Sequence, residues 1–167
     1  MANTDYATRG SEARPGPYGQ MQSPAVPAAN TDGVLGRRVV AYVIDFVVIW
    51  LLIGLLAPLI GIAGFFTFGA AWGLYLILVP GTAILYSALS IGGPAMGTLG
   101  MRLSGLTALD ASNGGRASPL LAGLHALLFY IGIGTLALYV LDIVIGLARS
   151  DRRLGHDLLA DIIVVRR

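Results

Sequence analysis

The chain has 167 residues, of which 56% are hydrophobic and 12% charged, and its formal net charge is +2. The few charges lie outside the long apolar runs, a pattern typical of a bilayer-embedded protein rather than of a soluble core. The chain contains no cysteine and no lysine. Disulfides, thiolate catalysis, zinc–thiolate sites, a P-loop lysine and Schiff-base chemistry are therefore excluded. The small excess of arginine is too slight to indicate a nucleic-acid partner, and we expect it to orient the protein in the membrane.

Residues 1–33 are rich in Ala, Pro, Gly, Ser and Asn. Such a segment cannot bury enough apolar surface to offset the entropy of ordering, so we expect a disordered N-terminal tail. It lacks a short apolar core followed by a small-residue cleavage site. We therefore expect the first apolar run to act as an uncleaved signal-anchor, within a transmembrane domain that covers residues 34–167.

The first apolar run extends from about Arg37 to Ile62. About 20 apolar residues are needed for a helix to cross a hydrocarbon layer roughly 30 Å thick, so this run predicts one span. Pro58 falls near its far end, where a kink or frayed turn is tolerated. The uncharged connection that follows, residues 61–69, is predicted to be a tight turn at the membrane interface.

A second span is predicted from about Ala70 to Ile91. Tyr86 lies towards its end, as interfacial aromatic residues prefer, and Pro80 predicts a kink in the middle. Gly69 and Gly73 have a small-xxx-small spacing through which another helix, including one from a second copy, could approach closely.

The glycine-rich loop at residues 92–118 and the C-terminal tail each contain a candidate strand. Leu103 to Leu109 could be extended, and the four branched residues from Ile162 to Val165 favour a strand over a helix. We expect these two segments to pair as a short two-stranded sheet if both lie on the cytoplasmic face. The loop glycines resemble a phosphate-binding loop only superficially, since no lysine accompanies them.

The hydrophobic segment at residues 119–148 has two interpretations. It could form one span, or two half-length helices broken at Gly132–Ile133–Gly134. A single crossing would put the arginines of the C-terminal tail on the face opposite to Arg37 and Arg38, against the positive-inside bias. We therefore favour an even number of crossings, with both termini in the cytoplasm of a bacterial-type plasma (inner) membrane. The predicted fold is an all-α membrane protein, a small transmembrane helical bundle with two spans and a third long or re-entrant segment.

Asp45 is the one charged residue between Val39 and Ile60. A carboxylate at bilayer depth costs on the order of 2.5–3.5 kcal/mol on insertion scales, so it requires a partner or has a function. Arg38 shares its helix face but lies roughly 10 Å away along the axis, too far for a direct bond. We expect Asp45 to meet a donor from a neighbouring segment.

Asp142 is predicted to lie at a similar depth to Asp45 if the number of crossings is even. Two such carboxylates beside an arginine could bind a small cation or exchange a proton. Structural roles are the alternative: Arg38 would snorkel to the interface, Asp45 would make a bond between helices, and Asp142 would serve packing.

His125 lies in the third hydrophobic segment and His156 in the tail. One histidine in each region, without soft ligands, predicts no metal site, and no cofactor motif is present. His156 precedes Asp157, but no serine or cysteine nucleophile follows at a recognisable spacing, so we expect no enzymatic activity. Asp157 is expected to cap the chain or to accept from Arg152 or Arg153.

Three sequence blocks resemble the RDD family of membrane proteins, named for one arginine and two aspartates. GRRVVAYVID, at 36–45, contains Arg38 and Asp45 at the family's spacing. GTLGMRLSGL, at 97–106, is similar to the family's TxGKRLxGL loop. RRLGHDLLADIIVV, at 152–165, places Asp157 where the family has its second aspartate.

This chain departs from the family pattern at three positions. Met101 stands where lysine is common, Asp161 replaces a usual glycine, and His125 falls where an arginine often occurs. The resemblance implies a membrane domain with a link to transport, since some members are reported to exchange sodium or protons. Asp45 and Asp142 are then the candidate ion or proton site. The alternative is a non-catalytic scaffold or accessory protein whose Arg/Asp set is structural. Besides the lipid bilayer, we expect a second copy or another membrane protein as partner.

Overall fold

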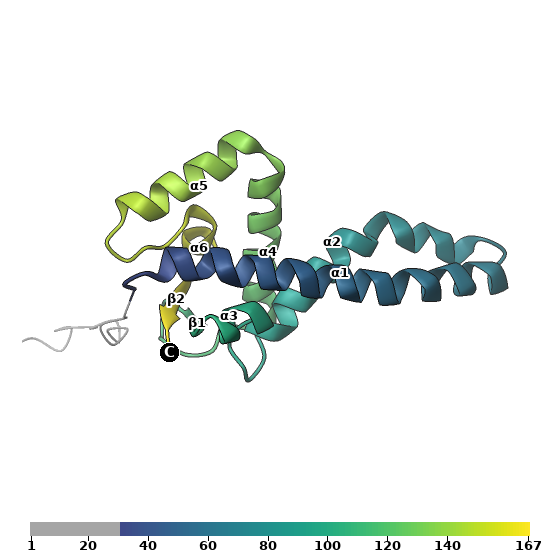
Figure 1. The fold of residues 1–167 in the computed structure, drawn as a ribbon, viewed down its shortest axis with the longest axis horizontal. Helices are drawn as coiled ribbons and strands as arrows, with labels where there is room; N and C mark the ends of the chain where they lie inside the picture. The colour runs from purple at the N-terminus through teal and green to yellow at the C-terminus, as the bar shows by residue number, and fades with distance from the viewer. Residues whose placement is uncertain (1–30) are drawn as a thin grey trace, which may run out of the picture.

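The computed structural model describes residues 31–167, so most of the predicted disordered tail lies outside the described residues. The elements, shown in Figure 1, are α1 (Val34–Phe66), the 3₁₀ helix η1 (Ala70–Leu74), α2 (Tyr75–Ile91), α3 (Leu99–Leu103), β1 (Leu106–Asp110), α4 (Pro119–Gly134), α5 (Leu136–Ala148), α6 (Gly155–Leu159) and β2 (Ile162–Arg166).

A long helical hairpin of α1 and α2 forms one arm of the molecule (Figure 1). Val34–Phe66 and Ala70–Ile91 are long and apolar enough to cross a membrane, which confirms the two predicted spans. Large apolar side chains such as Leu51, Leu55 and Leu76 stay exposed on the outer faces of this hairpin. In a bilayer these faces meet lipid, so their exposure does not carry the penalty that water would impose.

The turn between the two spans is shorter than predicted. α1 continues through Pro58 to Phe66, so only residues 67–69 connect it to η1, and the expected turn over residues 61–69 is wrong. Proline removes a single amide donor, and a helix can continue past it where neighbouring groups satisfy the backbone. The Tyr75 hydroxyl donates to the carbonyl of Ala57, the residue before Pro58, at 2.7 Å, so the start of α2 also binds the end of α1.

Gly69 and Gly73 do not lie together on an α-helix, and the approach of a second copy to them stays a prediction. Gly69 has a positive φ of 94° and precedes η1, so it belongs to the turn and not to α2. Gly64 is the glycine that packing requires here, because a methyl group on it would overlap the Trp72 indole. The close approach therefore occurs near the end of α1, where Gly64 packs against the Trp72 indole of η1.

The third hydrophobic segment forms two helices. α4 and α5 meet at Thr135, where the chain direction changes by 119°. Thr135 is extended (φ −126°, ψ 106°), and Gly132 and Gly134 precede it. Glycine weakens a helix interior, which explains why the run breaks at this point. The two-helix interpretation is confirmed, and Figure 1 shows α5 returning towards α6 after α4 has led away from it.

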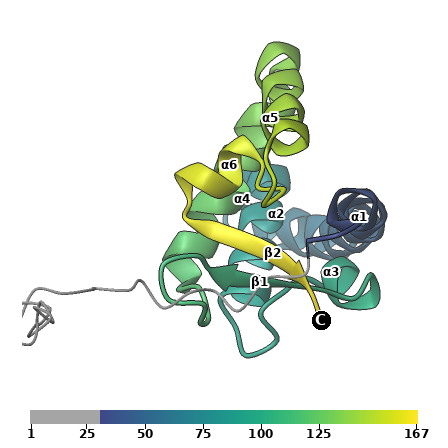
Figure 2. The same ribbon diagram turned by 90° about the vertical axis from the view of Figure 1, so that its left-hand side faces the viewer.

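The short elements α3, β1, β2 and α6 lie below and to one side of the first part of α1, which is seen end-on in Figure 2, and form a layer there. β1 and β2 pair antiparallel, from Leu106 opposite Arg166 to Asp110 opposite Ile162, which confirms the predicted sheet. β1 starts later than expected because Leu103 ends α3. The buried face of the sheet, with the start of α1, forms one apolar core that includes Val34, Leu106 and Ile162.

Candidate functional site

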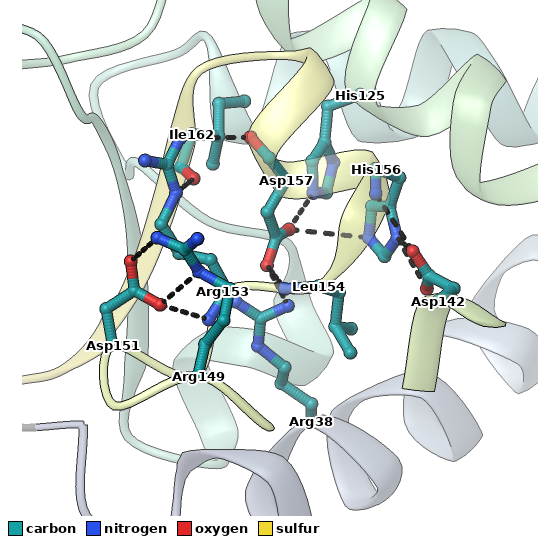
Figure 3. Close-up of polar contacts among 10 residues, drawn as sticks. All are labelled: Arg38, His125, Asp142, Arg149, Asp151, Arg153, Leu154, His156, Asp157 and Ile162. Atoms are coloured by element: carbon teal, nitrogen blue, oxygen red, sulfur yellow. Dashed lines mark hydrogen bonds and ion pairs between the residues drawn. The ribbon is translucent and has the colours of Figure 1, made fainter. Parts of the chain in front are cut away.

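Two groups of polar side chains contact the first part of α1. The Asp45 cluster consists of Asp45, Tyr86, Thr98 and Gly100. The Asp157 cluster consists of Arg38, His125, Asp142, His156 and Asp157 (Figure 3).

Three donors from neighbouring segments bind the Asp45 carboxylate, as the sequence predicted. The Tyr86 hydroxyl of α2 donates to Oδ1 at 2.6 Å, and the Thr98 hydroxyl donates to Oδ2 at 2.5 Å. The Gly100 amide of α3 donates to Oδ1 at 2.8 Å. Hydrogen bonds to an ionised group are the stronger class, each contributing about 1.5–3 kcal/mol. Asp45 therefore joins α1, α2 and α3.

The sequence TLG at residues 98–100 forms this binding loop by helix capping. Thr98 is the N-cap of α3, and its hydroxyl oxygen accepts from the Met101 amide at 3.2 Å while it donates to Asp45. The Tyr86 oxygen in turn accepts from the Leu99 amide at 3.0 Å. Gly100 has no Cβ, and a methyl group there would overlap the Ala41 carbonyl oxygen. Glycine is what allows α3 to touch α1.

Asp157 is fully buried and has partners on both carboxylate oxygens (Figure 3). Arg38 Nη1 lies 2.6 Å from Oδ2, and His125 Nε2 lies 2.8 Å from Oδ1. The Leu154 amide donates to Oδ2 at 2.9 Å, so Asp157 also caps the start of α6, as predicted.

Two interpretations of the arginines are wrong. Arg38 does not snorkel to an interface; its guanidinium points inward and 14% of its side chain is exposed. Arg153 does not donate to the Asp157 carboxylate; its Nε donates to the Ile162 carbonyl at 2.9 Å. The tail arginine therefore fixes β2, and the arginine of α1 pairs with Asp157.

Burial by itself would raise the pKa of Asp157, but the Arg38 guanidinium, followed by the His125 imidazole, holds that pKa well below its ordinary value of 3.8. Since the pKa is lower in the folded protein than in the unfolded chain, the stability that ionised Asp157 contributes is present above about pH 4 and is lost as the pH falls through the folded value.

We expect the difference in melting temperature between wild type and Asp157→Asn to shrink as detergent-solubilised samples are acidified below about pH 4. A constant difference across that range would contradict the ion pair.

Asp142 pairs with His156 and not with Asp45. The His156 Nδ1 atom lies 2.8 Å from Asp142 Oδ2, and the His156 amide donates to Oδ1 at 2.9 Å. Each carboxylate therefore has its own partners, and the joint ion or proton site of Asp45 and Asp142 stays a prediction.

The two histidines lie side by side although they are far apart in the sequence. Their ring centroids are 4.8 Å apart, and His156 Nε2 lies 3.4 Å from the Asp157 Oδ1 atom that also contacts His125. The expectation of no metal site assumed that these residues belong to separate regions. The bend between α4 and α5 removes that separation, because it brings Asp142 and α6 back against α4.

A cavity of about 130 Å³ lies between the two clusters, and Arg38, Asp45, Thr98, His125 and His156 are among its lining residues. Within residues 31–167, the Nε and Nη2 atoms of Arg38 and the Nδ1 atom of His125 are buried without a hydrogen-bond partner. The arginine and the first aspartate thus face one shared cavity from the same helix.

Sequence reasoning missed the partners of the aspartates. Tyr86 was interpreted as an interfacial aromatic residue, yet its hydroxyl contacts Asp45. Two signals were available. Thr98 stands in the quoted loop block with capping chemistry, and His125 occupies a position where the family often has a cationic residue.

Of the comparisons with known proteins, the one with family models gives a match. No curated protein and no solved structure matches this chain. The sequence model of the RDD family matches residues 33–161, from the residue before α1 to the residue before β2. This range contains Arg38, Asp45 and Asp157 with all their side-chain partners, and the chain therefore belongs to the RDD family.

Proposed function

We propose that this protein is a non-catalytic membrane scaffold or accessory protein, in which Arg38, Asp45 and Asp157 attach the layer of short elements to the spans. The observation that carries this proposal is the saturation of both aspartates by fixed donors. Asp45 receives three hydrogen bonds and Asp157 is bound on both oxygens. A transport carboxylate must release its ligand in each cycle, whereas these carboxylates are bound by parts of the fold itself.

The length of α1 supports a position for Asp45 at the membrane boundary. Its 33 residues extend about 50 Å, roughly 20 Å more than the hydrocarbon layer. The half of α1 that pairs with η1 and α2 is fully apolar, and the segment from Val34 to Asp45 carries both arginines and the aspartate. We infer that the span begins near Asp45, which lowers the cost of that charge, and that the first third packs in the cytoplasmic layer.

The same arrangement favours an even number of crossings in a plasma membrane. α4 and α5 both contact α6, so the bent pair starts and ends against the same layer. Arginine-bearing segments on either side of the pair would then lie in the cytoplasm, as the positive-inside bias requires. We propose cytoplasmic N- and C-terminal ends, with α4 and α5 as a re-entrant or strongly tilted hairpin.

Cation or proton transport is the second candidate, and the cavity beside Asp45 favours it. That cavity is lined by Asp45, His125 and His156, and chains of carboxylates and imidazoles serve as proton relays in membrane transporters. An enzymatic role has less support, since the described histidines make their side-chain polar contacts to carboxylates and no hydroxyl or thiol nucleophile is among them.

Asp45→Asn separates the scaffold and transport candidates. The asparagine side chain keeps one oxygen acceptor, but its NH₂ group would face one of the donors that now bind the carboxylate. We therefore expect a loss of about 2–3 kcal/mol of stability and less folded protein. Wild-type protein in proteoliposomes is expected to show no sodium- or proton-dependent pH change above that of empty vesicles.

Two further variants serve as matched controls. Tyr86→Phe and Thr98→Val each remove one donor to Asp45, so the structural role predicts graded destabilisation of about 1.5–3 kcal/mol in each. Strong wild-type ion flux that is retained by these two variants and abolished in a folded Asp45→Asn protein would refute the scaffold role and establish transport.

A further inference from the structure

We propose that His125, His156 and Asp157 form a binding site for a divalent transition-metal ion of the zinc class, with the metal held by His125 Nε2, His156 Nε2 and Asp157 Oδ1. These three residues come from α4 and α6, and an ion between them would lock the bent helix pair to the C-terminal tail. The site shares His125 and Asp157 with the scaffold role: a metal would replace the His125–Asp157 contact on Oδ1, while Arg38 and the Leu154 amide would still bind Oδ2.

The positions of the three ligand atoms fit a metal centre. They all lie within 4.8 Å of one another; His125 Nε2 is 2.8 Å and His156 Nε2 is 3.4 Å from Asp157 Oδ1. Tetrahedral zinc with bonds of about 2.0–2.2 Å separates its ligand atoms by roughly 3.4 Å. His156 Nε2 already lies at this separation from Asp157 Oδ1, whereas His125 Nε2 would have to move about 0.6 Å away from Oδ1 and the widest pair to close by up to about 1.4 Å, within reach of side-chain rotation.

Asp142 prepares His156 for coordination. It accepts from the His156 main-chain amide at 2.9 Å and contacts Nδ1 at 2.8 Å, which fixes the ring orientation. In the tautomer that carries its proton on Nδ1, this carboxylate accepts that proton, and Nε2 can offer its lone pair to a metal beside Asp157 Oδ1. Metal-binding histidines commonly have this second contact to a carboxylate, which also strengthens the imidazole as a ligand.

The charge of the cluster also favours a cation. Arg38 contributes +1, while Asp142 and Asp157 contribute −1 each, so the cluster sums to −1 when both imidazoles are neutral. Arg38 does not block the metal, because it contacts Oδ2 of Asp157 and leaves Oδ1 to face the two imidazoles. Two imidazoles and one carboxylate suit zinc, cobalt or nickel better than magnesium or calcium, which prefer ligand sets made wholly of oxygen.

An open coordination position would face the cavity of about 130 Å³, since both histidines are among its lining residues. Zinc sites that bind a water or another small ligand have three protein ligands and an open fourth position. The ion would therefore remain reachable from the cavity that also contains Asp45.

The test uses the full chain, purified in detergent with an affinity tag that contains no histidine and stripped with a chelator. Titration with Co²⁺ is expected to give the visible absorption of a tetrahedral centre at one equivalent, and Zn²⁺ is expected to displace it. Asp142→Asn should weaken binding about 10–100-fold, because it removes the contact that orients His156.

His125→Ala and His156→Ala are expected to abolish the signal, with folding checked by gel filtration and circular dichroism. Asp151→Asn is the matched control: it removes a carboxylate of the same tail that pairs with Arg149, and binding should not change. Folded wild-type protein with no tetrahedral cobalt spectrum and no zinc binding would overturn the proposal without any variant. Unchanged binding in a folded His125→Ala/His156→Ala double variant would also overturn it.

Discussion

Replacing Asp157 with asparagine is expected to destabilise the folded protein by about 3–5 kcal/mol, the usual cost of removing one partner from a buried ion pair. Asp157 is completely buried and its Oδ2 atom lies 2.6 Å from the Arg38 guanidinium. The variant would leave that guanidinium buried, with two of its nitrogens already lacking partners within residues 31–167. Chelator-treated protein in detergent should show the loss as a lower melting temperature.

An exposed ion pair in the same tail provides the control. Arg149 Nη2 lies 2.7 Å from Asp151 Oδ2, but the two side chains are 44% and 31% exposed. Exposed pairs contribute about 0–1 kcal/mol, so Asp151→Asn should have little effect. The double variant Arg38→Met/Asp157→Asn should recover part of the loss, because no unpaired charge remains buried. Equal, small effects of Asp157→Asn and Asp151→Asn would show that the buried pair does not hold α6 to α1.

Gly100→Ala is expected to have the second-largest effect, about 1–3 kcal/mol, because α3 is in direct contact with the α1 backbone at this residue. Its methyl group would overlap the Ala41 carbonyl oxygen of α1 and would lie 2.8 Å from the Asp45 carboxylate. The helix would have to separate from α1, and the 2.8 Å bond from the Gly100 amide to Asp45 would lengthen or break. Thermal unfolding and the rate of trypsin cleavage after Arg102 of α3 would both report the change.

Gly54→Ala is the matched control for this variant. Gly54 lies inside α1, and a methyl group there meets no atom within 4 Å. Alanine is favoured over glycine in a helix interior by up to about 1 kcal/mol, so stability should be unchanged or slightly higher. If both glycine variants behaved alike, the close approach of α3 to α1 would not be the cause of the effect at Gly100.

The local pattern of the sequence predicted the spans, the break in the third apolar segment and the sheet, but not α3, α6 or the continuation of α1 to Phe66. Length and apolarity predicted the two spans, and the branched run from Ile162 to Val165 predicted the strand that pairs with β1. The arginine distribution favoured two helices over one for residues 119–148, in agreement with the bend at Thr135. These features depend on residues that are neighbours in the chain, so composition and periodicity contain them.

The tertiary structure decided the partners of the charged residues. Asp45 is bound by Gly100, which is 55 positions away, and Asp157 is bound by His125, which is 32 positions away. An unpaired buried charge is costly, so the sequence required that each aspartate have a partner, but periodicity carries no information about which distant donor reaches it. That choice depended on Gly100, which admits α3 to α1, and on the bend that returns Asp142 and His156 to His125.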